Sequence, residues 1–191
     1  MPRTLCVFCG SSERVAPAYF EAASDLGRRL AAAGWGLVFG GGTIGLMGAV
    51  ARGVHEGGGH VVAVIPERLN RPGIVYDTAD EIIVTTTMRE RKAEMDRRAD
   101  AIVALAGGFG TLEEVLEAIT LKQLGYHDRP IILVNTERFY DSLSKLFEGQ
   151  IQAGFVRPEH RALYHVSASP ADAVAYIGAY QPSPLPDKLT F

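Results

Sequence analysis

The sequence predicts an α/β protein with a Rossmann-like three-layer fold, in which helices cover both faces of a central parallel sheet of about seven strands. Short β-rich apolar runs alternate with longer helical stretches through almost all of the 191 residues, a pattern typical of parallel sheets with crossover helices. Several runs, such as VVAVI and IILV, are apolar without alternation. Such runs favour strands that are buried on both faces.

The predicted elements follow one another without a linker or an internal repeat. Strands are predicted at 4–9, 36–40, 60–65, 82–86, 101–106, 130–135 and, more weakly, 163–168. Helices are predicted at 17–33, 45–57, 88–98, 111–124, 139–152 and 170–179. Residues 66–80 form the longest irregular stretch, with two prolines, which predicts a lid or a partner-facing loop.

The length suits one domain, which we expect to span residues 1–180. Residues 181–191 form a proline-rich tail that we expect to lie outside the core. Hydrophobic residues make up 47% of the chain and charged residues 21%, and no apolar run approaches the ~20 residues of a membrane span. The first residues lack the pattern of a secretory signal, so a cytoplasmic location is expected. A net charge of −3 argues against a nucleic-acid polymer as partner and is compatible with a single nucleotide.

Cys6 and Cys9 form a C-x-x-C motif, which occurs in redox sites and in zinc sites. They lie in a predicted strand, however, where positions three apart point to opposite faces. No second C-x-x-C and no histidine cluster completes a metal site. We therefore expect two reduced cysteines in or beside the core, and neither a metal nor a cofactor.

Ligands of such sheets bind at the carboxyl ends of the strands, where loops lead into helix N-termini. The first such loop, CGSS at 9–12, offers the Ser11 hydroxyl either to a ligand or as a helix N-cap. The second, FGGGTIGLMG, contains Gly40, Gly42 and Gly45 in a G-x-G-x-x-G pattern, and Glu67 lies 22 residues further on. A dinucleotide site is one interpretation, although the loop follows the second strand rather than the first.

A second glycine loop, GGFGT at 107–111, also follows a buried strand. Glycine lets peptide N–H groups approach an anion, and a helix N-terminus adds partial positive charge. Two such loops on parallel strands predict a phosphate site, to which Thr111 would contribute its hydroxyl.

The stretch TTTMRERKAEM at 85–95 begins with Thr87-x-x-Glu90, a candidate capping box. Helical spacing places Arg91 and Lys92 on a face with Met88 and Met95. Cations on an apolar stripe predict an anionic ligand.

Glu114 has two interpretations. Thr111-x-x-Glu114 is itself a candidate capping box, whereas a carboxylate one turn after a glycine loop is suited to catalysis. At about 100° per residue, the main core stripe of this helix is predicted to be Leu112, Leu116, Ile119 and Gln123. Glu114 points instead with Ala118 and Leu121, a second apolar side. This phase predicts a partly desolvated carboxylate near the anion site.

The motifs GGGTIGLMG, MRERK and GGFGTLEE, in this order, resemble the Lonely Guy family of cytokinin riboside 5′-monophosphate phosphoribohydrolases, some of which have also been labelled lysine decarboxylases. The likeness extends to about residue 156, including KQLGYHDRPIILVN and FYDSL. One departure is Ala106, where the family usually has a proline that makes the start of the loop rigid.

The resemblance implies hydrolysis of the N-glycosidic bond of a purine nucleoside 5′-monophosphate, either AMP or a cytokinin ribotide, to free base and ribose 5-phosphate. It implies Arg91 and Glu114 as the catalytic pair. It implies a nucleotide site formed by Gly42, Thr43, Gly45, Met88, Lys92, Gly107, Gly108, Gly110 and Thr111. Ser11, in the CGSS loop, is a further candidate for this site. A homodimer with sites near the subunit interface is also implied.

Two other functions compete with this one. Lysine decarboxylation usually uses pyridoxal phosphate on a lysine Schiff base, and the only lysines are Lys92, Lys122, Lys145 and Lys188. A non-catalytic nucleotide or nucleotide-cofactor carrier on the same fold is the stronger alternative. The sequence decides neither the base nor the physiological role.

Overall fold

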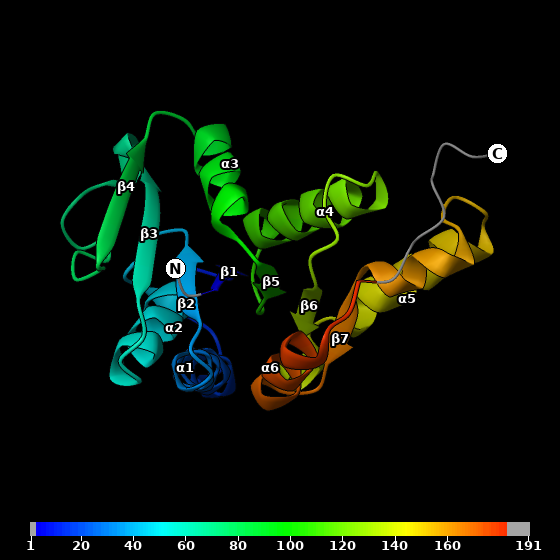
Figure 1. Ribbon diagram of the computed structural model, residues 1–191, viewed down its shortest axis with the longest axis horizontal. Coiled ribbons are helices and arrows are strands. Elements are labelled where there is room, and N and C mark those ends of the chain that lie inside the picture. Colours follow the sequence, from blue (N-terminus) through cyan, green and yellow to red (C-terminus); the bar gives the residue numbers. More distant parts are fainter. Residues whose placement is uncertain (1–2, 183–191) are drawn as a thin grey trace.

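A computed structural model describes residues 3–182 and shows a parallel sheet between two layers of helices (Figure 1). The sheet has seven strands: β1 Thr4–Phe8, β2 Gly36–Phe39, β3 Val61–Pro66, β4 Glu81–Thr85, β5 Ala101–Ala104, β6 Ile131–Val134 and β7 His165–Ser167. The α-helices are α1 Pro17–Ala32, α2 Gly45–Glu56, α3 Met88–Arg98, α4 Phe109–Gln123, α5 Asp141–Gln152 and α6 Pro170–Ala179. Short 3₁₀ helices lie at η1 Glu67–Leu69, η2 Thr136–Arg138 and η3 Pro158–Leu163.

The strand order is β4-β3-β2-β1-β5-β6-β7, and every pairing is parallel. Strands β2, β3 and β4 are therefore added in turn on one side of β1, and the chain then returns to pair β5 with the other side of β1. Loops that follow β1 and β5 diverge at this point, which is where open α/β sheets bind ligands. The predicted fold class is confirmed.

Two apolar layers separate the helices from the sheet. One contains buried residues of α1, α2 and α6, and the other contains those of α3 and α4 together with partly buried residues of α5. Cys9 belongs to the first layer and Cys6 to the second, and both are free thiols. The prediction of two reduced cysteines on opposite faces is confirmed.

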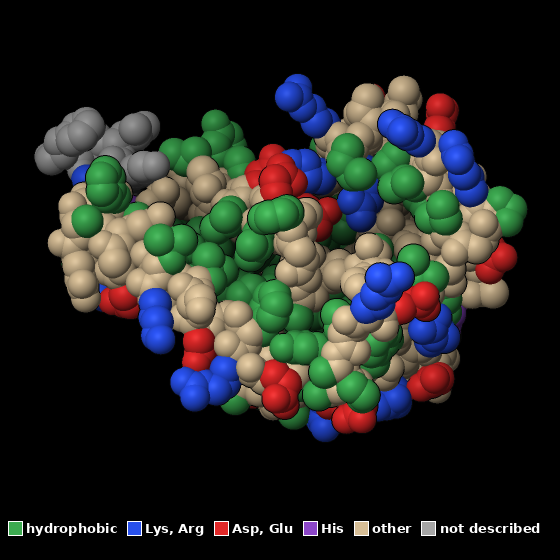
Figure 2. Space-filling model, turned by 180° about the vertical axis from the view of Figure 1, so that it is seen from behind, with side chains coloured by type: hydrophobic (Ala, Val, Ile, Leu, Met, Phe, Trp, Pro, Cys, Tyr) green, Lys and Arg blue, Asp and Glu red, His purple; other side chains and the backbone are tan. Residues whose placement is uncertain are grey.

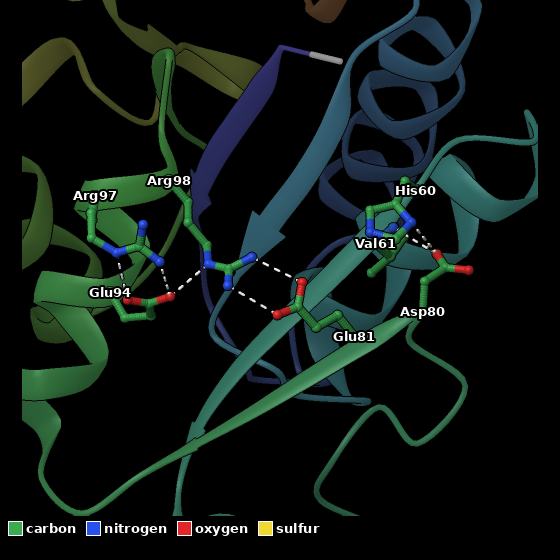
Figure 3. A network of polar contacts seen from close by, with 7 residues as sticks. All are labelled: His60, Val61, Asp80, Glu81, Glu94, Arg97 and Arg98. Atoms are coloured by element: carbon green, nitrogen blue, oxygen red, sulfur yellow. Dashed lines mark hydrogen bonds and ion pairs between the residues drawn. The ribbon is translucent and has the colours of Figure 1, made fainter. Parts of the chain in front are cut away.

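A polar network fastens the outer strand β4 to the rest of the fold (Figure 3). Arg98, at the end of α3, donates two hydrogen bonds of 2.9 Å to the two carboxylate oxygens of Glu81. At the start of the strand, Asp80 accepts a 2.8 Å hydrogen bond from the Val61 N–H. Each contact stabilises the fold only weakly, but together they hold the start of β4 against the start of β3 and the end of α3.

Most predicted elements are present with ends shifted by one or two residues. The strand predicted at 163–168 is shorter, because the 3₁₀ helix η3 occupies the residues up to Leu163. The helix predicted at 111–124 begins earlier, at Phe109. Of the tail predicted at 181–191, residues 183–191 lie outside the described part.

Candidate active site

A cavity of about 400 Å³ opens at the carboxyl ends of β1, β2, β3 and β5. Loops after these strands form its walls, and α3 and α4 close it. Its lining residues are Cys9, Gly10, Ser11, Gly40, Gly42, Ile44, Met47, Ile65, Leu69, Ile74, Arg91, Gly108, Gly110, Thr111 and Glu114. We call this space the main cavity. It brings both glycine loops together with Arg91 and Glu114, as the sequence predicted.

Arg91 is held rigidly on α3. The helix starts with the capping box predicted at Thr87 and Glu90, in which each side chain accepts a hydrogen bond from the other residue's backbone N–H. One turn later, Arg91 is 9% exposed, and its Nε donates a 3.1 Å hydrogen bond to the Val64 carbonyl oxygen at the end of β3. Its Nη1 donates a 3.0 Å hydrogen bond to Glu114 Oε1.

Gly40 makes room for this guanidinium. A β-carbon at position 40 would lie 1.6 Å from Arg91 Nη2, far inside contact distance. The sequence interpretation assigned Gly40 to an anion-binding loop and missed this second role. No local pattern reveals it, because the contact joins the residue after β2 to a helix about 50 residues later.

Glu114 lies on α4 with 11% of its side chain exposed. Burial raises the pKa of its carboxyl above the ordinary value, and the nearby Arg91 guanidinium only partly opposes this effect. The predicted desolvated carboxylate is thus confirmed. The capping interpretation is wrong, because Gly108 is the N-cap and Thr111 lies within the first turn of the helix, with only 4% of its surface exposed.

The core stripe predicted for α4 is also wrong in part. Leu116 is 38% exposed, whereas the buried residues are Thr111, Val115, Ala118 and Lys122. This stripe lies one position away from the predicted one. Glu114 therefore borders the true buried face.

The GGFGT loop ends in an open helix N-terminus. No side chain caps α4. Gly107 packs tightly, since a β-carbon there would lie 2.1 Å from Thr111 Oγ1. Gly108 and Gly110 line the main cavity, and a β-carbon at either would meet nothing within 4 Å. The N–H groups in the first turn of a helix have no partner within the helix. Such groups bind phosphate well.

The other glycine loop closes against its neighbours. Gly45 has φ +63°, and a β-carbon there would lie 2.4 Å from the Ser11 carbonyl carbon. Gly42 pairs with Val75 in an antiparallel bridge, and the Thr43 N–H donates a 2.8 Å hydrogen bond to the Ile74 carbonyl oxygen. Gly42 lines the main cavity, but Thr43, Gly45 and Gly107 do not. Their roles in the structure are to shape the loops.

Lys92 faces elsewhere. Its Nζ pairs with the carboxylates of Glu113 and Glu117, the latter at 2.7 Å. Lys92 and the two glutamates line a groove of about 550 Å³ between α3 and α4. The groove also touches Glu114, but neither glycine loop lines it. Met88 lies outside the main cavity too, although its sulfur accepts a 3.2 Å hydrogen bond from Arg91 Nη1. The structure therefore separates Arg91 from Lys92, which the sequence had placed on one ligand-binding face.

The irregular stretch at 66–80 contributes residues that the sequence reading did not single out. Leu69 and Ile74 from this stretch line the main cavity beside Ile44. Each of the three is nearly 40% exposed. Apolar side chains in an otherwise polar loop were the available signal. They give the main cavity one apolar wall.

The fold and the main cavity define a Rossmann-like α/β protein with a glycine-lined site, containing a buried ion pair, at the topological switch point. The sequence profile of a family described as "Possible lysine decarboxylase" matches residues 47–177. The chain belongs to this family, and its curated relatives are the Lonely Guy proteins that its motifs resemble.

LOGL2 of Oryza sativa subsp. japonica, a probable cytokinin riboside 5′-monophosphate phosphoribohydrolase, is 43% identical over 180 residues, which cover 94% of this chain and 74% of that protein. LOG5 of Arabidopsis thaliana, named as a cytokinin riboside 5′-monophosphate phosphoribohydrolase, is 43% identical over 94% of this chain and 79% of its own length. LOGL3 of Oryza sativa subsp. japonica, another probable member, is 48% identical over 158 residues, which cover 83% of this chain and 75% of that protein.

Solved structures of similar fold include molybdenum cofactor proteins. The carrier protein of Chlamydomonas reinhardtii matches with a TM-score of 0.71 and 27% identity over 93% of this chain and 96% of that chain. The molybdenum cofactor binding protein of Rippkaea orientalis matches with a TM-score of 0.73 and 24% identity over 94% of this chain and 97% of that chain, which shows the fold alone.

The buried carboxyl of Glu114 predicts a pH dependence of stability. Because its pKa is raised in the folded state, the protonated form stabilises the fold below the unfolded pKa, and this contribution is lost as pH rises through the folded pKa. The free energy of unfolding of the wild type, minus that of Glu114→Gln, should decrease by up to about 1.4 kcal/mol per pH unit between the two pKa values. Urea unfolding from pH 4 to 8 measures it. A difference that grows with pH would show that the attraction of Arg91 outweighs burial.

Proposed function

We propose that the protein hydrolyses the N-glycosidic bond of purine nucleoside 5′-monophosphates, AMP and cytokinin ribotides among them, to the free base and ribose 5-phosphate. The observation that carries this proposal is the buried Arg91–Glu114 pair, 3.0 Å apart, in one cavity with the uncapped N-terminus of α4. Curated relatives that are 43% identical to this chain over 94% of its length are named as phosphoribohydrolases.

The shape of the main cavity suits the three parts of such a substrate. The phosphate would accept hydrogen bonds from N–H groups at the start of α4, beside Gly108 and Gly110. The apolar wall of Ile44, Leu69 and Ile74 would receive the base. The ribose would then lie between them, next to the ion pair.

The reaction needs charge stabilisation at the ribose. As the bond between C1′ and the base nitrogen breaks, positive charge develops on the sugar, and a nearby carboxylate stabilises it. Glu114 supplies that carboxylate and can take a proton from the attacking water, whose oxygen bonds to C1′. The bonding electrons leave with the base nitrogen, which takes up a proton. A carboxyl with a raised pKa is suited to such proton transfer near neutral pH.

Arg91 would hold the ribose and the carboxylate in place. Its guanidinium is permanently charged and is fixed from β3 through the Val64 carbonyl. Holding a substrate close to its catalytic group supplies a large part of enzymatic rate enhancement. No step in this scheme uses a metal or an organic cofactor.

Decarboxylation of lysine, which the family description suggests, does not fit the residues present. A pyridoxal phosphate enzyme needs a lysine in its site, and no described lysine lines the main cavity. Lys92 is paired with two glutamates in the neighbouring groove, and Lys122 is buried near the opposite end of α4 against Tyr180. The carrier alternative keeps the same binding site and differs only in the absence of turnover.

Incubation with AMP should release adenine and ribose 5-phosphate, detected by chromatography. Glu114→Gln should lower kcat by about 10²–10⁴-fold while AMP affinity changes little, because Gln keeps the volume and most of the polar contacts. The matched control is Glu113→Gln, one residue away on the more exposed side of α4, which should retain activity. AMP that binds to the wild type without release of base over hours would support a carrier instead.

We also propose that the protein is a homodimer. Phe109 and Leu116 on α4, and Met88 at the start of α3, are 93%, 38% and 47% exposed. Figure 2 shows hydrophobic side chains gathered in a hollow on one face, with charged side chains at its rim. Exposed apolar surface of this kind is typical of protein interfaces.

Light scattering should therefore give twice the chain mass. Leu116→Glu should shift the protein toward the monomer, because a carboxylate would be buried beside Glu113 and Glu117. Leu146→Glu, an exposed leucine on α5, serves as control and should leave the dimer intact. A monomeric wild type, or dissociation by the control alone, would contradict the proposed interface.

The expected cytoplasmic location stays a proposal. Two reduced, buried cysteines suit a reducing compartment. Within residues 3–182, no helix has the length and apolar character needed to cross a membrane.

A further inference from the structure

The turn between β6 and α5 has an unusual backbone. Glu137 and Arg138 adopt φ angles of +52° and +59°, the left-handed region that residues other than glycine rarely occupy. Such conformations persist only where surrounding contacts determine them, and they cluster at functional sites. The turn lies on the carboxyl side of β6, next to the edge of the sheet that carries the main cavity.

Asn135 holds this turn in place. Its Oδ1 accepts a 2.7 Å hydrogen bond from the Tyr140 N–H, and its Nδ2 donates a 2.9 Å hydrogen bond to Asp141 Oδ1. Arg138 adds a 2.7 Å hydrogen bond from Nε to Asp141 Oδ2. The strained conformation therefore sets the direction in which Phe139 and Tyr140 leave the turn.

Tyr140 reaches the strand that precedes the GGFGT loop. Its side chain is 1% exposed, and its hydroxyl donates a 2.7 Å hydrogen bond to the Leu105 carbonyl oxygen. The next carbonyl, that of Ala106, accepts a 3.0 Å hydrogen bond from the Gly10 N–H. Burial raises the pKa of the Tyr140 phenol well above its ordinary value, so it stays a donor across the working pH range.

Phe139 supports the same loop from its other side. It lines a small cavity of about 270 Å³ together with Ala106, Gly107 and Gly108. Its ring packs edge-on against Tyr140, with ring centroids 5.0 Å apart. The turn thus contacts the start of the glycine loop through an aromatic wall and one buried hydrogen bond.

The hydroxyl of Tyr140 does more than fill space in the core. A phenylalanine would supply the same ring, so the oxygen contributes only its bond to Leu105. Among the described residues, the Ala106 N–H donates to no backbone carbonyl, and alanine, unlike proline, has no ring that fixes its φ angle. Two accepted hydrogen bonds, one at Leu105 and one at Ala106, therefore fix the backbone just before Gly107.

We propose that Tyr140 is a positioning residue: through the Leu105 carbonyl it sets the backbone at the start of the GGFGT loop, and so the direction of the N–H groups that bind the 5′-phosphate. This inference rests on the proposed function, because it assumes that a phosphate binds there. It gives the strained turn a role in substrate binding, although the turn lies outside the main cavity.

Tyr140→Phe should raise the KM for AMP by about three- to ten-fold, the usual effect of one lost hydrogen bond, while kcat changes less than about two-fold. The dissociation constant of ribose 5-phosphate, measured by calorimetry, should rise in parallel. That of adenosine, which lacks the phosphate, should not change. Equal weakening of all three ligands, or of none, would overturn the proposal.

Ala106→Pro supplies the second half of the test. Proline fixes φ and removes an N–H that makes no backbone hydrogen bond here. Added to Tyr140→Phe, it should restore ribose 5-phosphate affinity to within about two-fold of the wild type, since it makes the same backbone rigid by other means. Failure to restore it would contradict the proposed role of the loop.

If Tyr140→Phe does not fold, the single variant Ala106→Pro decides. It should leave the affinity for ribose 5-phosphate unchanged, and a several-fold gain in that affinity would show that the wild-type loop is not already fixed.

The matched control is Tyr180→Phe. The Tyr180 hydroxyl also donates a 2.9 Å hydrogen bond to a backbone carbonyl, that of Asp128. Asp128 comes before β6, so this bond lies at the amino ends of the strands, away from the main cavity. Affinities for all three ligands should stay at the wild-type values. Because ribose 5-phosphate binding needs no turnover, a protein that binds it but leaves AMP intact would refute the hydrolase proposal and still test Tyr140.

Discussion

The ion pair between Arg91 and Glu114 is the constraint on which the site depends. Both side chains are only 11% exposed, and removing charges from water is expensive unless the pair is well aligned and further hydrogen bonded. The fold meets that condition with a carbonyl from β3, a glycine directly after β2 that leaves space for the guanidinium, and the start of α4 after β5, which places Glu114 beside Arg91. Each of these comes from the carboxyl side of a different strand. The pair can exist only where several such loops meet.

The strand order supplies that meeting point. Since β5 returns to the free side of β1, the loops after β1, β2 and β5 open side by side. One glycine loop leaves backbone N–H groups accessible, and the other closes the cavity by packing against Ser11 and bridging to Val75. The same edge extends to β6, where the strained turn carries Tyr140 back to the Leu105 carbonyl. The proposed anion site, the ion pair and the contact from Tyr140 are therefore consequences of one topology.

Much of this could be predicted from the sequence, and the limits have physical reasons. Buried strands and glycine loops are local signals, so the sequence predicts the fold class, the glycine loop that begins α4 and the capping box at Thr87. Contacts between distant segments leave no local pattern, which is why the space that Gly40 leaves for Arg91 was missed. Lys92 lies apart from Arg91 because neighbouring helical residues differ by about 100° in direction, enough for one to face the main cavity and the other the groove. The capping box at Thr111, one of two interpretations left open by the sequence, is absent because a glycine backbone can begin a helix without a side chain.

A crystal structure of the Glu114→Gln variant with AMP bound tests the central claim most directly, because this variant should hold an intact substrate. The account predicts the 5′-phosphate on the backbone N–H groups at the start of α4, the base against Ile44, Leu69 and Ile74, and C1′ of the ribose facing the side chain at position 114 and the Arg91 guanidinium. A nucleotide whose ribose lies away from this pair, with its phosphate elsewhere than the GGFGT loop, would contradict it.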